Sequence, residues 1–178
     1  MARPQPRVPH TLAAVAAILL AFWLAWLGYL VVQRSRVARF VGVPLAYVQP
    51  QHNGILGMDT PAPYFYVTSP DGRHLASVFI TLSGRPTGIT LAVRSGGLIE
   101  QTQPDPLLSP ARTDQLGRTL VGRYWRLSPA QLRGYRYKRS QHGSVTASWT
   151  TSDPRNGAFV LRAVPGHYVS VDHEGVVR

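Results

Sequence analysis

The chain has 178 residues, a formal net charge of +11 and no cysteine. This length accommodates one ordinary domain beside a membrane segment, and the missing cysteine excludes disulfides, thiolate catalysis and cysteine-ligated metal sites. Hydrophobic residues make up 44% of the chain and charged residues 15%, a composition typical of a packed core and not of a disordered protein.

Residues 11–32 (TLAAVAAILLAFWLAWLGYLVV) contain no charged side chain. As a helix this run is about 33 Å long, enough to cross a hydrocarbon core of about 30 Å. Because no small-x-small cleavage site follows it, we expect an uncleaved signal-anchor and not a signal peptide. The predicted organisation is a short basic tail over 1–10, a transmembrane helix over 11–32, a juxtamembrane linker over 33–45 and an extramembrane domain over 46–178.

Arginines flank the membrane segment on both sides. Arg3 and Arg7 precede it, and Arg34, Arg36 and Arg39 follow it, so the positive-inside rule gives a near tie. We expect the N-terminus to lie inside and the domain outside the cytoplasm, which makes the chain a single-pass protein of the cell membrane. A fragment of residues 40–178 is then expected to fold on its own.

Small side chains recur along one face of the membrane helix, at Ala13, Ala17, Ala21, Ala25 and Gly28. Such a stripe lets two membrane helices approach closely. It predicts packing against a partner's helix or in a homodimer. The alternative is that alanine, a common residue in this chain, falls into register without such a role.

Beyond the linker, apolar residues alternate with the period of two that half-buried strands show. Strands are expected in a meander over 63–103 and again over 144–150, 158–164 and 167–171. Ser69-Pro70-Asp71-Gly72 marks one turn and residues 153–157 (DPRNG) mark another. About six or seven such strands predict a mainly-β domain, an antiparallel sandwich or small barrel. The sequence shows no internal repeat.

The middle of the chain is ambiguous. Residues 114–127 fit a helix through Leu116, Leu120 and Tyr124, yet two glycines and the apolar run also suit a strand, so both stay open. Ser128-Pro129-Ala130-Gln131 is a clearer signal, with an N-cap serine, a proline at the first helical position and a glutamine at the third. It predicts one short helix, with Gly134 as its C-cap.

Positive charge is concentrated in residues 112–139. From residue 40 on there are fourteen arginines and lysines against eight acids, and eight of the fourteen lie in this segment with a single acid, Asp114. Four aromatic residues are interleaved with them. The segment predicts an anionic partner, a lipid or a polymer, bound through Arg118, Arg123, Arg126, Arg133, Arg136, Lys138, Arg139, Tyr124, Trp125, Tyr135 and Tyr137. Alternatively, the rings belong to the core and the arginines to its solvated far side.

Catalytic signatures are weak. The histidines are scattered, and the one group that approaches a cluster, around His167 and His173, matches no metal spacing, so no metal and no cofactor are expected. A serine–lysine pair would have to use Lys138, the chain's single lysine, with Ser128 or Ser140. Neither serine stands in a recognisable catalytic setting.

The leading hypothesis is therefore a non-enzymatic, membrane-anchored interaction or assembly domain that docks a partner protein or an anionic surface. One alternative is a cytoplasm-facing domain that tethers nucleic acid to the membrane, which requires the opposite orientation. A second alternative is an envelope hydrolase.

Overall fold

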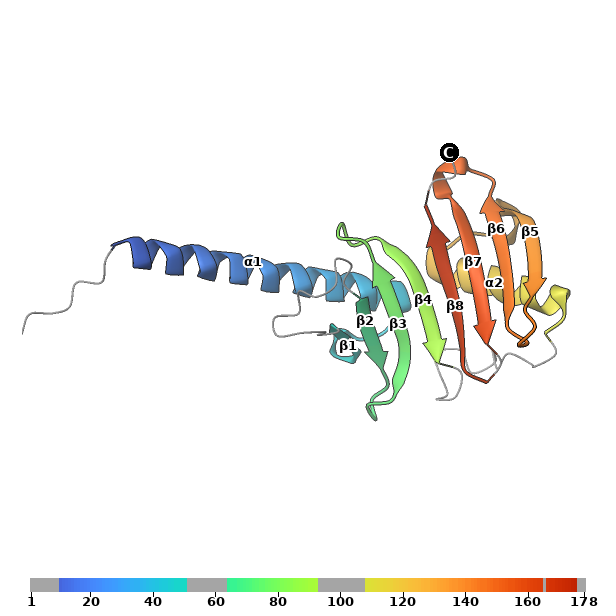
Figure 1. Cartoon of the computed structure of the whole chain (residues 1–178), viewed down its shortest axis with the longest axis horizontal. Coiled ribbons are helices and arrows are strands. Elements are labelled where there is room, and N and C mark those ends of the chain that lie inside the picture. Colours follow the sequence, from blue (N-terminus) through green and yellow to red (C-terminus); the bar gives the residue numbers. More distant parts are fainter. Residues whose placement is uncertain (1–9, 51–63, 93–107, 165, 176–178) are drawn as a thin grey trace, which may run out of the picture.

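The computed structural model describes residues 10–50, 64–92, 108–164 and 166–175 (Figure 1). A long N-terminal helix is followed by strands and a second, shorter helix. The elements in chain order are α1 (His10–Val41), the 3₁₀ helix η1 (Leu45–Tyr47), β1 (Val48–Pro50), β2 (Tyr64–Thr68), β3 (His74–Ile80), β4 (Pro86–Ala92), α2 (Pro110–Trp125), η2 (Pro129–Gln131), β5 (Leu132–Arg139), β6 (Val145–Thr151), η3 (Pro154–Asn156), β7 (Ala158–Val164) and β8 (Tyr168–Glu174).

The strands form one antiparallel sheet with the order β1-β2-β3-β4-β8-β7-β6-β5. In Figure 1, α2 and the C-terminal end of α1 lie behind this sheet, whereas the rest of α1 projects beyond it. The buried side chains of both helices share one hydrophobic core with the strands. The predicted apolar N-terminal helix and the antiparallel, mainly-β domain are confirmed. The layer that packs on the sheet consists of helices and not of further strands.

The order of elements repeats once along the chain. A helix, a 3₁₀ helix and a four-stranded meander occur twice, and the two meanders join edge to edge through β4 and β8. Residues in equivalent places around the first turn of each half lie 84 positions apart. The 3₁₀ helix η2 begins 84 residues after η1, and the strand pair Val48–Val67 corresponds to the pair Leu132–Thr151. The fold therefore has two related halves about an approximate twofold axis between β4 and β8.

One arginine in each half ties its helix to the chain that follows. Arg34 of α1 donates to the carbonyl oxygens of Leu45 at 3.2 Å and Val48 at 2.9 Å. Its counterpart Arg118 in α2 donates to the equivalent carbonyl oxygens of Pro129 and Leu132, at 2.9 and 2.7 Å. The two arginines supply donors to backbone carbonyls that the turn leaves outside the strand ladder.

The segment predicted as a juxtamembrane linker, 33–45, differs in the structure, because α1 continues without a break to Val41. Val37, Ala38 and Val41 are at most 6% exposed and belong to the core. The arginines of this segment led to the prediction of a solvent-exposed linker. In the structure they lie on the sides of α1, next to its buried apolar face. The folded domain thus begins inside α1 and not at residue 46.

The β3–β4 hairpin packs against α1 between Tyr29 and Arg36, at the C-terminal end of the apolar run and just after it. Tyr29 Oη donates to the carbonyl oxygen of Leu82 at 3.0 Å, and Arg36 Nη1 donates to that of Ser83 at 2.6 Å. Gly84, with φ of +81°, lies so close that a Cβ there would meet α1 side-chain atoms at 2.1 Å. These contacts hold α1 at a fixed angle to the sheet.

The ambiguous middle segment is a helix, α2. It starts at Pro110, and Ser109 Oγ accepts a hydrogen bond from the backbone N–H of Arg112 at 3.3 Å. Gly117, one of the two glycines that weakened the helix prediction, has a packing role: a Cβ there would lie 1.9 Å from the ring of Trp149.

The short helix predicted at residue 128 is confirmed as η2, and the backbone N–H of Ser128 donates to Gln131 Oε1 at 2.7 Å. Its C-cap is Leu132, so the prediction of Gly134 as the cap is wrong. Gly134 instead lies at a bulge in β5 with φ of +65°, where a Cβ would approach Thr150 Oγ1 to 2.5 Å. Bulges of this kind need the left-handed backbone that glycine adopts without strain.

Both predicted turns join neighbouring strands. Between β2 and β3 the N–H of Ser69 donates to the carbonyl oxygen of Arg73 at 2.8 Å, and between β6 and β7 the Asp153 side chain accepts from the N–H of Arg155 at 2.9 Å. The strands predicted over 144–150, 158–164 and 167–171 correspond to β6, β7 and β8. Within the predicted meander, residues 63 and 93–103 lie outside the described residues, as do residues 1–9 of the predicted tail.

Candidate functional site

Two aromatic side chains of the basic segment lie where the C-terminal ends of α1 and α2 meet. Tyr124 is 4% exposed and packs against Phe40, its counterpart in the other half, with ring centroids 5.4 Å apart. Trp125 packs edge-on against Phe40 and Phe159, with a centroid distance of 5.1 Å to each ring. Both rings therefore build the seam between the halves, as the core alternative predicts.

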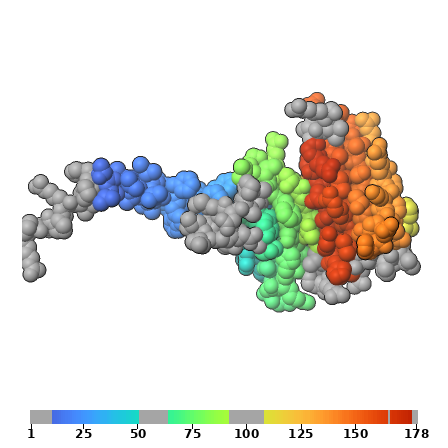
Figure 2. Space-filling view, viewed as in Figure 1, coloured from blue at the N-terminus to red at the C-terminus, as the bar shows by residue number. Residues whose placement is uncertain are grey.

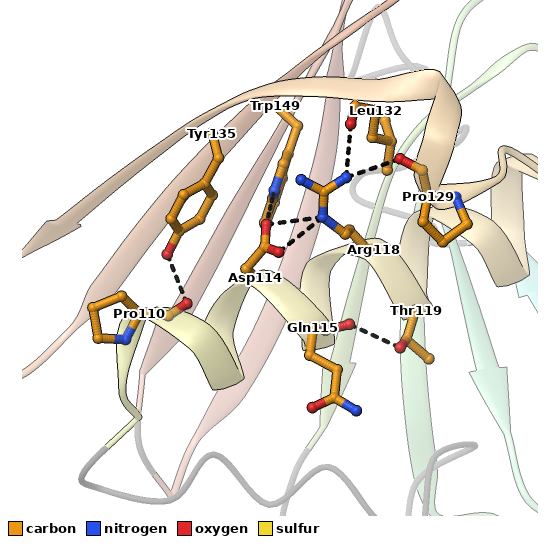
Figure 3. A network of polar contacts seen from close by, with 9 residues as sticks. All are labelled: Pro110, Asp114, Gln115, Arg118, Thr119, Pro129, Leu132, Tyr135 and Trp149. Carbon is orange, nitrogen blue, oxygen red and sulfur yellow. Dashed lines mark hydrogen bonds and ion pairs between the residues drawn. The ribbon is translucent and has the colours of Figure 1, made fainter.

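Tyr135 and Tyr137 lie on the helix side of β5. Tyr135 Oη donates to the carbonyl oxygen of Pro110 at 2.8 Å (Figure 3), and Tyr137 Oη donates to that of Leu108 at 3.1 Å. These bonds hold the start of α2 against the sheet. Because side chains alternate along a strand, Arg136 and Lys138 lie on the opposite face.

Arg118 belongs to a polar network between α2 and the sheet (Figure 3). Its Nε donates to both carboxylate oxygens of Asp114 at 3.0 and 2.8 Å, and Trp149 Nε1 donates to the same carboxylate at 2.6 Å. Burial alone would raise the pKa of Asp114, but the hydrogen bonds from Arg118 and Trp149 and the positive charge of Arg118 lower that pKa below its ordinary value. The hydrogen bonds of Arg118 are thus used within the fold, to Asp114 and to the backbone around η2.

The other predicted cations separate into two groups. Arg133, Arg136, Lys138 and Arg139 are exposed on β5, at the end of the sheet order opposite β1; we call these four residues the distal basic edge. Arg123 and Arg126 lie at the end of α2, beside α1, with the Arg123 guanidinium 5.6 Å from the centroid of the Tyr124 ring. Residues that are adjacent in the sequence therefore face different surroundings.

A pocket of about 420 Å³ lies where Arg126 approaches α1 and the β3–β4 hairpin. We call it the junction pocket; its lining residues are Arg36, Arg39, Phe40, Gly84, Pro86, Tyr124 and Arg126. In the part of the chain that the structure describes, none of its three arginines forms an ion pair with an acidic side chain. Sequence reasoning missed Arg36 and Arg39 as site residues, because no spacing along the chain relates them to Arg126.

The side chains considered for catalysis do not converge. Lys138 is exposed on β5, whereas Ser128 Oγ donates to Gln131 Oε1 at 3.0 Å, and Ser140 Oγ pairs with Ser144 Oγ. Among the described residues, no three His, Asp or Glu side chains are placed to hold a metal ion. His52, one of the scattered histidines, lies outside the described residues.

The stripe of small residues in α1 is exposed. A Cβ on Gly28 would meet no atom within 4 Å, and the alanines of the stripe likewise lie on the exposed part of the helix. The stretch Thr11–Val41 is long and apolar enough to cross a membrane. Packing of this stripe against another membrane helix stays a prediction.

The described residues thus include a membrane-type helix, a basic pocket at the C-terminal end of that helix, and the distal basic edge at the β5 end of the sheet. Comparisons with protein-family models, with curated proteins and with solved structures returned no match for this chain.

Proposed function

We propose that the chain is a single-pass, membrane-anchored docking domain without enzymatic activity, which holds its sheet at a fixed position over the bilayer and presents it to an anionic partner. The continuity of α1 carries this proposal. The helix is apolar and exposed over its first part, and Val37, Ala38 and Val41 in its last turns are core residues. A continuous helix that lies in the bilayer over its first part and in the core over its last turns couples the domain to the membrane without a flexible tether.

The docking surface is the sheet face turned away from the helices, which Figure 2 shows across strands β3 to β8. At the distal basic edge, Lys138 is level with Thr146 and Arg162 on the neighbouring strands, and Arg136 is level with Ser148 and Val160. Apart from Arg162, these neighbours are short. Short side chains bordered by long cations suit an extended anionic partner, because exposed charges steer encounter and set specificity.

The test uses the full chain in nanodiscs of neutral lipid, with polyglutamate as the anionic probe. The double variant Arg136→Ser/Lys138→Ser is expected to weaken binding by about three- to tenfold at low salt, since each exposed charge contributes modestly. Added salt should shrink the difference. The matched variant Arg73→Ser/Arg155→Ser removes the same charge from two turns and should bind as the unaltered chain does. Equal affinity of all three proteins would contradict the proposal.

Orientation decides which anion is available, and the proposed arrangement has the domain outside the cytoplasm. Because the chain has no cysteine, an Arg136→Cys variant gives a single reactive thiol. A membrane-impermeant maleimide added to intact cells is expected to label it. Labelling that occurs only after the cells are opened would contradict this orientation and would favour nucleic acid as the partner.

A further inference from the structure

We propose that the junction pocket binds the phosphate of an anionic phospholipid headgroup through Arg36, Arg39 and Arg126. This inference uses the membrane placement of α1 proposed above, but not the distal basic edge. Guanidinium groups match phosphate oxygens well, because their N–H donors form a planar fork.

The first observation is convergence. Arg36 and Arg39 come from the last turns of α1 and Arg126 from the end of α2, while Gly84 and Pro86 of the β3–β4 hairpin form another wall. Arg36 uses Nη1 for the Ser83 carbonyl oxygen, and Arg39 uses Nε for the Ser35 carbonyl oxygen at 3.3 Å. Each guanidinium keeps further donors, and all three side chains belong to exposed residues.

The second observation is the backbone of Arg126. It has φ of 60° and ψ of 30°, and it is the one non-glycine residue with positive φ among the described residues. Its counterpart 84 positions earlier is Gly42, with φ of +80°, which ends α1 in the same way. Glycine takes this left-handed conformation without steric cost, whereas an arginine does not. The second half thus places a strained arginine where the first half has a glycine, and the side chain of that arginine lines the pocket.

The third observation concerns Tyr124. This residue is part of the pocket wall, and its buried hydroxyl finds no hydrogen-bond partner within the described ranges. A buried hydroxyl without a partner is costly, and an oxyanion beside it would provide the missing acceptor. The wall therefore contains a donor that the fold itself does not use.

The depth of the pocket identifies the source of the phosphate. The apolar run ends at Val32, so Arg36 lies about 6 Å and Arg39 about 10 Å further along the helix axis. The headgroup layer extends about 5–8 Å beyond the hydrocarbon on each side. The hairpin tip lies closer still to the hydrocarbon, because Leu82, which is 64% exposed, bonds to Tyr29 within the apolar run. Arg36, on the membrane side of the pocket, therefore lies within the headgroup layer, and Arg39 lies just beyond it, so the pocket opens at the level of the lipid phosphates.

The experiment uses the full chain in neutral detergent, titrated with short-chain phosphatidylglycerol and followed by the thermal unfolding midpoint and by retention of the lipid in native mass spectrometry. The unaltered chain is expected to bind saturably and to be stabilised. Arg126→Gly is expected to reduce the affinity by about tenfold or more, since charge-assisted bonds are lost. The same variant should melt, without lipid, at the same or a higher temperature, because glycine relieves the left-handed backbone.

Arg136→Ser is the control, since it removes the same charge from the distal basic edge and should keep full lipid affinity. Unchanged affinity of Arg126→Gly, or equal losses in both variants, would overturn the proposal. Inorganic phosphate at the same concentrations is expected to bind much more weakly; binding as strong as that of the lipid would overturn the lipid assignment. The polyglutamate test is separate, so failure at the pocket and failure at the distal basic edge can be told apart.

Discussion

A fragment of residues 28–178 is expected to fold as a soluble domain, whereas a fragment of residues 42–178 is expected to be unfolded. This replaces the expectation from the sequence that residues 40–178 fold on their own, because the core includes Val37 and Ala38. Both lack most of the apolar run, but the shorter one also loses Val37, Ala38 and Val41 from the core and the Arg34 bonds to η1 and β1. Burying a single valine stabilises a protein by about 1.5–3 kcal/mol, and total stabilities are about 5–15 kcal/mol. Losing two valines and the surface that covers their neighbours removes most of that stability.

Far-ultraviolet circular dichroism and thermal unfolding distinguish the two fragments. The longer one should unfold cooperatively, and the shorter one should show no transition. Within the longer fragment, Val37→Ser should lower the midpoint strongly, while Val32→Ser, at a position 48% exposed, serves as the control. A cooperative transition of 42–178 at the midpoint of 28–178 would show that the last turns of α1 are dispensable.

Gly117→Ala is expected to destabilise the full chain by about 2–3 kcal/mol, as overpacking of a filled core does. The new Cβ would lie 1.9 Å from the ring of Trp149. That ring cannot yield easily, because it is fully buried and its Nε1 is bonded to Asp114 at 2.6 Å. Helix propensity favours alanine over glycine by about 1 kcal/mol. A destabilising result would therefore show that the contact with Trp149 outweighs helix propensity at this position.

Chemical denaturation of the detergent-solubilised chain measures this effect. Gly28→Ala is a matched control, since the same substitution in α1 meets no atom within 4 Å. A Gly117→Ala protein as stable as this control would mean that Trp149 does not pack against α2 as described.

Local patterns predicted much of the fold. The uncharged run predicted the membrane-type part of α1, and period-two alternation predicted β3, β4 and the C-terminal strands. Turn chemistry at Ser69 and Asp153 depends on a few neighbouring residues, so it could be recognised without tertiary context. The serine and proline before η2 were informative for the same reason.

Long-range relations were not predictable in this way. The two halves share few identities in the equivalent stretches, among them Arg34 with Arg118 and Ala46 with Ala130, so the repeat emerges only from shared contacts. The continuation of α1 beyond residue 32 was not predicted, because arginines are interspersed there with the few apolar residues that form its buried face. Gly117 argued against a helix until Trp149, far along the chain, explained it.

The candidate site shows the same division. The sequence located the excess of charge but could not tell which cations the fold uses, such as Arg118, from those it leaves exposed. The aromatic residues were predicted to join the site, with the core as the alternative, and the structure places Tyr124 in the seam. The junction pocket combines residues from α1 and α2, about 90 positions apart, which no local pattern connects.

In the proposed arrangement, α1 holds the domain against the bilayer, with the β3–β4 hairpin at the membrane surface. Single cysteines at Leu82 and Arg136 test it through their rates of reaction with a charged maleimide. In vesicles that expose the domain, the thiol of Leu82→Cys is predicted to react several times more slowly than that of Arg136→Cys. In the soluble 28–178 fragment the two rates should be similar. Equal rates in the vesicles would contradict the claim, because the domain would then stand clear of the membrane.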